Sequence, residues 1–391
     1  MLNVSQFTIH SSNFKLQTSN PRRLAMILVV GGAGYVGSVL VRELLARGYA
    51  VRVFDRMYYG DAGLREDRER IELRKGDVRT MDPSVLEGVE AVINLSGLSN
   101  DPTAEYNPKA NYEMNTRANL SLARLCKRKG IRRFVFASSC SIYDVGIADE
   151  EKDVVLDETS QVHPKAAYAN SKYQAETGLL ELADEDFCPV ILRKGTVYGF
   201  SPRMRYDLVV NTFLRDALSK GHVTTHYGGE MWRPLVDIRD SARAYILCLE
   251  AEESKVSGEI FNVVYRNFRI SELALRVVGT LKDVGVKVEL KPEYRYQGVR
   301  SYRVSGKKLE RMLGFAPAVT VEEAVKDMVE NVSRYGYTDF DNPRYYNIAW
   351  MKLLEEADEI IRITGSVFDT VPAASFKPAV VGMGGREPGS R

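Results

Sequence analysis

The stretch VVGGAGYVGS most constrains what this chain can fold into. Its glycines Gly31, Gly34 and Gly37 lie between an apolar, strand-like run at 26–31 and a helical pattern at 35–48. Glycines in such a turn permit a tight bend, close approach of the backbone to a pyrophosphate, and close packing of helix on strand. The helix N-terminus then faces the phosphates. The stretch therefore predicts a dinucleotide site on a strand–turn–helix unit.

A second strand-like run at 50–55 supports this interpretation, because three glycines alone are a weak signal. The run ends in Asp55, about 20 residues after the glycines, where an acid can accept from the adenosine ribose hydroxyls. A carboxylate there disfavours a 2′-phosphate, so we expect NAD rather than NADP. The neighbouring Arg56 is a cation that blurs this preference.

Apolar runs alternate with helical patterns through the first half of the chain. Such runs, separated by helices, are typical of a parallel sheet covered on both faces. After residue 195 the alternation weakens and helical patterns dominate. We predict an α/β fold, a doubly wound parallel sheet (Rossmann-type) with a smaller, mostly C-terminal α/β substrate-binding domain. The expected strands are 26–31, 50–55, 71–77, 91–97, 132–139, 188–195, 259–264 and 286–292, and the expected helices include 35–48, 108–130, 207–220, 237–253, 271–285, 305–313, 321–335 and 343–364.

The predicted domains follow from these patterns. A cleft between the two larger ones is the expected ligand site. The first residues contain no acidic side chain, and either a transit-like segment or a translation start upstream of Met26 explains them. The predicted divisions are an N-terminal extension at 1–25, an NAD-binding domain at 26–195 plus about 237–264, a substrate domain at about 196–236 and 265–345, a C-terminal helix at 346–365 and a disordered tail at 366–391.

The amino-acid composition argues against several classes of binding partner. The 54 basic and 52 acidic residues leave a net charge of +2, which gives no electrostatic reason to expect nucleic acid or a membrane surface. No apolar run approaches the roughly 18–20 residues of a membrane span. The four cysteines are widely spaced, which fits a reducing compartment such as the cytoplasm. His222 and His226 lie in KGHVTTHYGG, which we interpret as a polar loop rather than a metal site.

The stretch YANSK places Tyr168 and Lys172 four residues apart. On a helix this spacing puts both side chains on one face. A lysine ammonium beside a phenol would lower the pKa of the tyrosine toward neutrality, where it can act as a base. The pair alone does not decide the matter, because many helices carry a Tyr and a Lys at this spacing.

The glycine spacing and the later motifs together resemble the extended short-chain dehydrogenase/reductase family, in its NAD-dependent nucleotide-sugar epimerase/dehydratase group (UDP-glucose 4-epimerase-like). The resemblance covers about 26–345 and draws on KGDVR, NLSGLSND, NTRANLSLARLC and FASSCSIYD as well. It implies the cofactor NAD. The cofactor contacts that it implies are Gly31, Gly34, Tyr35, Val36, Gly37, Asp55, Arg56, Asp77, Val78, Leu95, Ser96, Gly97, Asn115, Ser138, Tyr168 and Lys172.

The resemblance also implies a catalytic set of Ser139, Tyr168 and Lys172. Tyr168 would take the proton of a sugar hydroxyl, Lys172 would lower the pKa of Tyr168 and hold the nicotinamide ribose, and Ser139 would position the reacting oxygen. The implied substrate is a nucleotide-diphosphate sugar. Its expected contacts are Ser99, Asn100, Ser139, Cys140, Ser141, Thr196, Asn211, Arg233 and Arg300.

One departure from the family pattern narrows the reaction. Dehydratases of the family carry an acid pair just after the catalytic hydroxyl residue, and decarboxylases keep a Glu there, whereas this chain has Cys140 and Ser141. Neither is an acid at neutral pH, so we expect neither elimination of water nor decarboxylation. The leading hypothesis is an NAD-dependent nucleotide-sugar epimerase acting at C4. The alternatives are an NAD(P)H-dependent 4-ketoreductase and, from another class, an inactive NAD-binding sensor or interaction protein.

The resemblance finally implies a homodimer, because the family pairs two helices across a two-fold axis into a four-helix bundle. Here the corresponding segments are 108–130 and 166–186, each with an apolar stripe. From the residues alone, the stripe serves equally well to cover the sheet.

Overall fold

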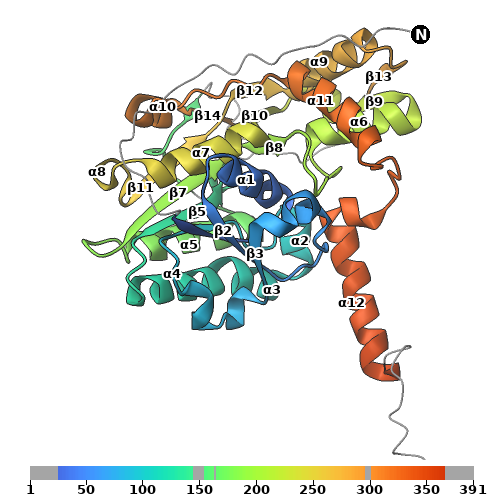
Figure 1. Ribbon diagram of the computed structural model, residues 1–391. Helices are drawn as coiled ribbons and strands as arrows, with labels where there is room; N and C mark the ends of the chain where they lie inside the picture. The colour runs from blue at the N-terminus through green and yellow to red at the C-terminus, as the bar shows by residue number, and fades with distance from the viewer. Residues whose placement is uncertain (1–24, 144–153, 163, 296–300, 366–391) are drawn as a thin grey trace, which may run out of the picture.

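A seven-stranded parallel sheet forms the centre of the molecule (Figure 1). The computed structural model describes residues 25–143, 154–162, 164–295 and 301–365. The strand order is β11-β7-β5-β4-β1-β2-β3, so the order reverses between β1 and β4, where α/β proteins bind ligands. The predicted Rossmann-type fold is confirmed. The strands are β1 Met26–Val30, β2 Ala50–Asp55, β3 Ile71–Lys75, β4 Ala91–Asn94, β5 Arg133–Ser139, β7 Cys188–Lys194 and β11 Glu259–Val263.

Helices cover both faces of this sheet because its strands are apolar on both faces. On one face, Leu40 of α1 (Tyr35–Ala46) and Tyr245 of α7 (Ile238–Glu250) are buried in one core with alternate strand residues such as Val29. On the other, Leu122 of α4 (Ala118–Arg128) and Leu179 of α5 (Ala167–Leu180) lie in a second core. Burial of these continuous apolar strands is the main stabilisation of a doubly wound sheet.

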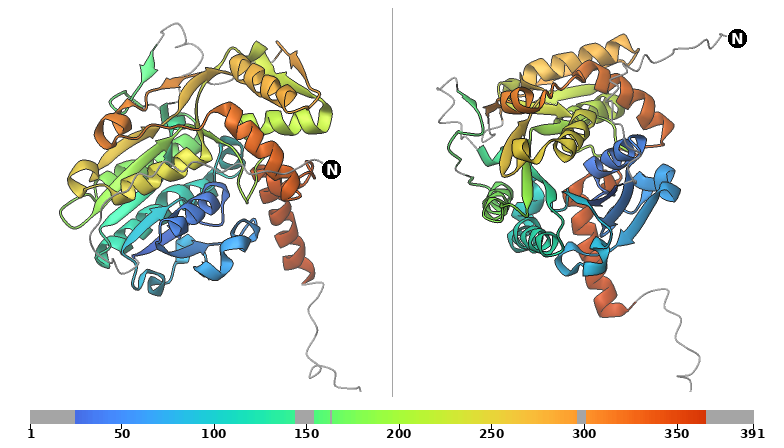
Figure 2. Two further views of the ribbon diagram at one scale, coloured as in Figure 1. Left: turned by 45° about the horizontal axis from the view of Figure 1, so that its top comes forward. Right: turned by 60° about the vertical axis from the view of Figure 1, so that its left-hand side comes forward.

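A third core lies beyond the carboxyl ends of the strands and gathers residues between Tyr198 and Val332. It joins the sheet β12-β10-β8 and the pair β13-β9 to three helices (Figures 1 and 2). The domain division drawn from the sequence stays a prediction. The elements are β8 Thr196–Tyr198, β9 His222–Thr225, β10 Trp232–Asp237, β12 Arg266–Arg269, β13 Glu289–Pro292, α6 Val209–Lys220, α9 Ile270–Asp283 and α11 Val321–Arg334.

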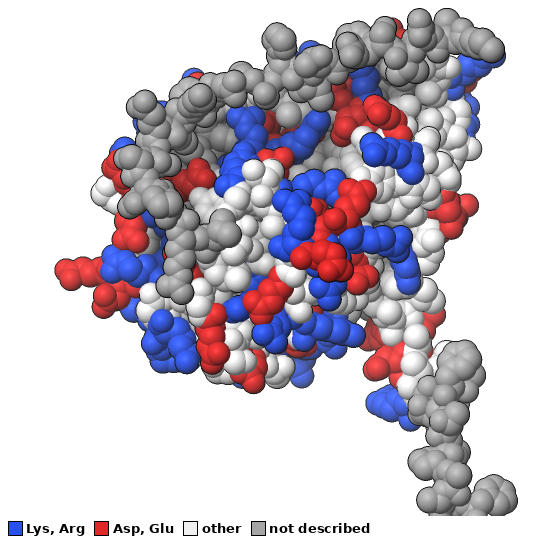
Figure 3. Space-filling model, viewed as in Figure 1, with Lys and Arg blue, Asp and Glu red and all other residues white. Residues whose placement is uncertain are grey.

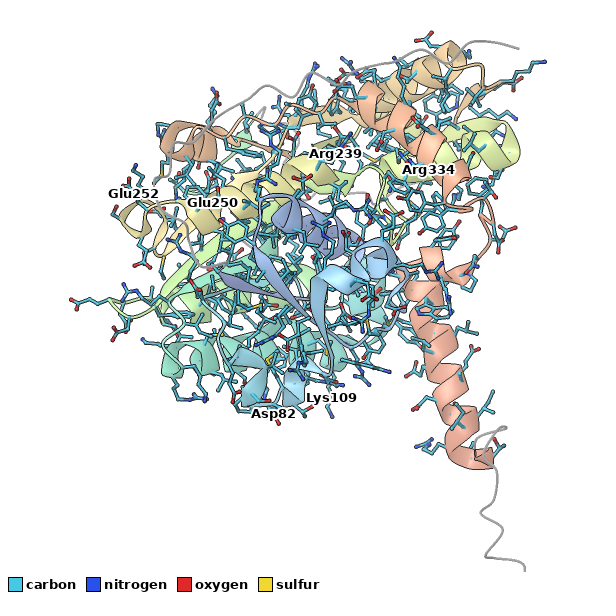
Figure 4. The ribbon with its side chains drawn as sticks, in the orientation of Figure 1. Asp82, Lys109, Arg239, Glu250, Glu252 and Arg334 are labelled. Carbon is cyan, nitrogen blue, oxygen red and sulfur yellow. The ribbon has the colours of Figure 1, made fainter. Side chains whose placement is uncertain are left out.

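Contacts between α7 and α11 tie the third core to the sheet. Nη1 of Arg239, in the first turn of α7, lies 4.0 Å from Oδ2 of Asp327 on α11. Figure 4 labels Arg239 beside α11 and Arg334 at the end of that helix, far from Asp82 and Lys109 at the other end of the molecule. This contact is one of those between α7 and the third core.

Several elements differ from the sequence-based prediction. His222 begins strand β9, so KGHVTTHYGG is not simply a polar loop. The helix expected at 108–130 is α3 Pro108–Tyr112, a π-helical turn at Glu113–Arg117, and α4. The short strands β8, β10 and β12 were not predicted. The remaining elements are α2 Asp101–Tyr106, α8 Glu253–Val256, α10 Lys307–Leu313, β6 Val155–Leu156, β14 Arg303–Val304 and the 3₁₀ segments Ala62–Arg70, Val78–Thr80, Pro83–Leu86, Cys140–Tyr143, His226–Gly229 and Pro343–Tyr345.

The last helix, α12 (Asn347–Thr364), begins beside α2 and extends away from the body of the molecule (Figure 2). Its first residue, Asn347, is buried, whereas Ile360, Ile361 and Ile363 near its end are exposed. The extension expected at 1–25 and the tail at 366–391 lie outside the described residues, except for Ala25.

Acidic and basic side chains are interspersed over the face shown in Figure 3, in keeping with the net charge of +2. None of the helices in the described ranges is both long and apolar enough to cross a lipid bilayer.

Candidate active site

A cavity of about 720 Å³ lies at the carboxyl ends of β1, β4, β5 and β7, below the third core. Its size falls within the usual range for small-molecule and cofactor sites. It runs from the glycine turn to Thr196 and Arg233 of the small sheet. The predicted site residues that line it are Gly31, Gly34, Tyr35, Val36, Gly37, Asp55, Arg56, Asp77, Val78, Leu95, Ser96, Gly97, Ser99, Asn100, Ser138, Ser139, Ser141, Tyr168, Lys172, Thr196 and Arg233.

The glycine turn between β1 and α1 is packed so closely that side chains have no room. Gly31 has φ +80°, and a Cβ there would lie 3.0 Å from the backbone nitrogen of Ser96. A Cβ on Gly37 would lie 2.3 Å from the carbonyl oxygen of Gly31. The first turn of α1 carries no acidic residue, so its free N–H groups face the cavity without a competing carboxylate. This cradle fits the pyrophosphate of a dinucleotide.

Asp55 ends β2 beside this turn. Its carboxylate accepts from the backbone N–H of Ala33 (Oδ2, 3.0 Å) and of Met57 (Oδ1, 2.7 Å). Burial raises the pKa of Asp55, and these two hydrogen bonds act against the rise. The side chain therefore fixes the glycine turn to β2 and keeps lone pairs directed at the cavity that could accept from ribose hydroxyls.

The cation next to Asp55 is neutralised within the protein. Nη1 of Arg56 lies 2.7 Å from Oδ2 of Asp77, and its guanidinium carbon lies 4.7 Å from the centre of the Tyr58 ring. Arg79 also bonds Asp77 and, as the largest cause, lowers the pKa of that carboxyl. An arginine paired in this way is a poor receptor for a 2′-phosphate, which fits NAD better than NADP.

The predicted catalytic side chains meet at the floor of the cavity. Ser139 is the last residue of β5, and Tyr168 and Lys172 lie in the first two turns of α5. The Ser139 hydroxyl acts on the Tyr168 phenol and favours a lower pKa there. Nζ of Lys172 donates to the backbone oxygen of Ala137 (2.9 Å), and the residue is only 4% exposed. The main chain of β5 thus positions the lysine.

The expected lowering of the pKa of Tyr168 by Lys172 is wrong for the protein alone. Burial raises the pKa of Tyr168 to about 12, Asp101 adds to the rise, and the hydrogen bond with Ser139 opposes it. Burial also lowers the pKa of Lys172 to about 8, against the attraction of Glu176. The ammonium group is bonded to a carbonyl rather than to the phenol, so desolvation dominates both groups.

A buried ion pair supports the floor from beneath. Nη2 of Arg193 on β7 lies 2.7 Å from Oε2 of Glu176 on α5, with both side chains less than 5% exposed. The Ser138 hydroxyl also donates to Glu176. Ser138 lines the cavity with its hydroxyl engaged by this pair, and its contact with the cofactor stays a prediction.

Three further predicted contacts do not line the cavity. Cys140 is fully buried and its Sγ donates to the backbone oxygen of Arg193 (3.1 Å). Asn115 is bonded to both backbone groups of Leu98 (2.8 and 2.9 Å), so it shapes the loop after β4 instead. The predicted substrate contact of Asn211 is wrong for the same reason. Its side chain accepts from the N–H of Gly199 and donates to the backbone oxygen of Arg205. Arg300 lies outside the described residues.

The predicted substrate-side residues Ser99, Asn100, Ser141, Thr196 and Arg233 line the same cavity. Nη1 of Arg233 donates to the backbone oxygen of Trp232 (2.8 Å), and the guanidinium carbon lies 5.7 Å from the centre of the Tyr302 ring. Ser141 Oγ donates to Ser139 Oγ (2.9 Å). Asn100 has φ +80° and caps α2 by accepting from the N–H of Thr103 (3.1 Å). This strained backbone lies where the loop after β4 enters the cavity.

Sequence reasoning missed several cavity residues. The six basic residues of the lining outnumber its three acids, Asp55, Asp77 and Asp101, which favours an anionic ligand. The closely spaced cations Arg203 and Arg205 in SPRMRYD, and Lys194 in LRKGTVYG, are a signal in the sequence that could have found them. No group of His, Cys, Asp and Glu among the residues described could hold a metal ion. The missed lining residues of interest are Tyr59, Asp101, Lys194, Arg203, Arg205 and Asn347.

A Rossmann sheet, a glycine cradle and a Ser–Tyr–Lys set at one cavity define a dinucleotide-dependent oxidoreductase site of the short-chain type. The sequence places the protein more narrowly. A profile of the NAD dependent epimerase/dehydratase family matches residues 27–263, and the chain belongs to this family. It is an NAD-dependent enzyme of the extended group whose members are nucleotide-sugar epimerases, dehydratases and decarboxylases.

Relatives with assigned names fall into more than one reaction class. UDP-glucuronic acid decarboxylase 1 of Xenopus tropicalis is 25% identical over 311 residues, 78% of this chain and 71% of that protein. A putative UDP-glucose 4-epimerase of Methanocaldococcus jannaschii is 26% identical over 312 residues, 78% of this chain and 97% of that protein. The solved UDP-glucose 4-epimerase of Thermotoga maritima with UDP-glucose is 26% identical, with a TM-score of 0.66 over 79% of this chain and 99% of that one.

Proposed function

We propose that this protein is a nucleotide-sugar epimerase that inverts C4 of the sugar. The observation that carries the proposal is that Ser139, Tyr168 and Lys172 line one cavity, with no carboxyl group at the two positions after Ser139. This set can remove and return one hydroxyl proton. It lacks the adjacent acid that the family's other two reactions use.

Each side chain has a separate task. Tyr168 exchanges a proton with the sugar hydroxyl, and Ser139 donates to the same oxygen and so fixes its position. Arg205 supplies positive charge that favours the phenolate form of Tyr168, whereas the ammonium group of Lys172, charged below about pH 8, is held by the Ala137 carbonyl. NAD supplies the hydride acceptor and donor when bound.

Decarboxylation is the main competitor because several relatives are named for it. Cys140 is buried away from the cavity, and Ser141 is bonded to Ser139, so neither position offers an acid. Asp101 acts on Tyr168 but begins α2 on the loop after β4. We infer that it raises the pKa of the phenol rather than transferring a second proton.

The substrate half of the proposal is a nucleoside diphosphate sugar. Arg233 lies at the cavity end away from the glycine turn, and an arginine fork suits two phosphate oxygens. A homodimer through α4 and α5 and a cytoplasmic location remain proposals drawn from the family resemblance and the cysteine usage.

The test is to incubate the purified protein, without added cofactor, with UDP-, dTDP-, GDP- and CDP-sugars and to follow products by NMR. The proposal expects one sugar pair to interconvert at C4 from either side with no net redox change. A pentose nucleotide with release of CO₂ would identify a decarboxylase. Consumption of a keto-sugar only when NADPH is supplied would identify a reductase.

A further inference from the structure

The loop between β8 and α6 places two arginines in the wall of the cavity. Neither of them is among the contact residues predicted from the sequence. Arg203 and Arg205 are each only 7% exposed, and both line the cavity. Arg205 is neutralised by Asp207, whose two carboxylate oxygens accept from its Nε (2.8 Å) and Nη2 (3.0 Å). The positive charge of this buried arginine is therefore balanced within the protein.

Arg203 has no comparable partner. Its Nη2 donates to the neutral Oδ1 of Asn347 (2.8 Å), and its guanidinium carbon lies 3.6 Å from the centre of the Tyr59 ring. Its Nε is buried and makes no hydrogen bond. Among the described residues, the neighbouring carboxylate of Asp207 pairs with Arg205 and not with Arg203. Burial lowers the pKa of Arg203 to about 10, which leaves it charged at neutral pH. A buried, charged group with an unused donor calls for an anion.

The position of Arg203 indicates which anion. Ser201, two residues earlier, donates to the backbone oxygen of Tyr35 (2.7 Å) and lies 2.9 Å from the hydroxyl of Ser38. The loop is therefore fastened to the first turn of α1, next to the glycine cradle. The charge of Arg203 also acts on Asp55 at the end of β2. The arginine thus faces the end of the cavity that the dinucleotide occupies, away from Arg233.

The C-terminal helix holds this arginine. Besides bonding Arg203, Asn347 donates from Nδ2 to Ser99 Oγ (2.7 Å), and its backbone N–H donates to Asp207 (3.0 Å). Asn347 is 4% exposed and is the first residue of α12. Residues 144 positions apart therefore build one side of the cavity.

We propose that Arg203, held by Asn347 of α12, binds the pyrophosphate of NAD from the side opposite the glycine turn. Two fixed sets of donors then enclose the same anion, one from the N-terminus of α1 and one from the third core. The inference concerns retention of the cofactor. It does not depend on which sugar nucleotide is the substrate or on whether C4 is the carbon inverted.

The test measures binding rather than turnover. Protein stripped of nucleotide is titrated calorimetrically with ADP-ribose, which carries the pyrophosphate, with adenosine, which does not, and with UDP. Arg203→Gln is expected to weaken ADP-ribose by about 10- to 100-fold, the loss of hydrogen bonds to a charged group, while adenosine and UDP change by less than about twofold. Arg203→Lys keeps the charge and is expected to recover part of the affinity.

A second variant covers the case in which Arg203→Gln fails to fold. Asn347→Asp places a carboxylate on the guanidinium without removing it, and is expected to weaken ADP-ribose by about tenfold through competition for the same cation. The proposal is overturned if ADP-ribose and adenosine weaken equally. It is also overturned if UDP is the ligand that weakens, because Arg203 would then belong to the sugar-nucleotide half of the cavity.

Discussion

Lys172 and Tyr168 lie one helical turn apart, yet the lysine ammonium is fixed by the backbone oxygen of Ala137 and not by the phenol. Both groups are desolvated, and desolvation moves their pKa values toward the neutral forms. In the protein without ligand, the side chain of Tyr168 is therefore a protonated phenol. At the residue scale, proton transfer depends on how far Ser139, Lys172 and Arg205 can stabilise the phenolate in the loaded site.

Tyr168→Phe removes the exchanging hydroxyl and leaves the ring. We expect turnover to fall by about 10²–10⁴-fold, the usual contribution of a positioned acid–base group. The released nucleotide after denaturation should still be NAD in unchanged amount. Full activity of this variant would exclude Tyr168 as the proton carrier.

Lys172 should leave a signature in the pH dependence of stability. Below about pH 8 both the folded and unfolded chains bind its proton; between about 8 and 10.5 only the unfolded chain does. The free energy of unfolding attributable to Lys172 should therefore rise with pH in that window, by at most about 1.4 kcal/mol per pH unit. Chemical denaturation of the stripped protein and of Lys172→Met measures the difference, which a flat or falling curve would contradict.

At the scale of elements, the catalytic side chains lie at the ends of the strands, and contacts between helices and strands stabilise these ends. Glu176 and Arg193 link α5 to β7 under the Ser138–Ser139 strand end, and the pair is almost wholly buried. Removing one member of a buried pair leaves an uncompensated charge.

Glu176→Gln should therefore destabilise the fold by about 3–5 kcal/mol, because Arg193 stays buried without its carboxylate. Urea denaturation is the measurement. Arg117, whose Nη1 lies 3.0 Å from Glu113 in an exposed pair, offers the control: Glu113→Gln should change stability by no more than about 1 kcal/mol. Equal effects of the two substitutions would contradict the role given to burial.

The glycine turn allows a second test at this scale. Gly37→Ala places a Cβ 2.3 Å from the Gly31 oxygen, and we expect a loss of about 1–3 kcal/mol from overpacking in the stripped protein. At Gly34 the nearest atom to an added Cβ lies at 3.2 Å, so Gly34→Ala should cost less. Thermal unfolding of both variants checks the order, and a reversed order would show that the turn is not packed as described.

The strands of the large sheet were predictable because burial on both faces makes them continuously apolar, as in Met26–Val30. The strands β8, β9, β10 and β12 were missed. They have three to six residues and pair with partners distant in the sequence, and they carry side chains such as Arg233 and His222 that mask the pattern. The π-helical turn at Glu113–Arg117 likewise has no signal in residue spacing.

At the scale of the whole molecule, the cavity joins parts of the chain that the sequence keeps far apart. The glycine turn and the residues Ser139, Tyr168 and Lys172 were predicted because each lies in a local motif. Arg203 and Asn347 were not, because their roles exist only after α12 meets the loop following β8. Cys140 was misplaced because its Sγ donates to the backbone oxygen of Arg193 on the neighbouring strand β7, a contact between residues 53 positions apart in the sequence.

The measurement that tests the central claim most directly uses the first sugar nucleotide that the protein converts, prepared with deuterium at C4. The protein is used as purified, with no cofactor added, and the product is analysed by NMR and mass spectrometry. The account predicts the C4 epimer with deuterium retained at C4 and no net change in oxidation state. Loss of the label to solvent, release of CO₂, or a requirement for added NADPH would contradict it.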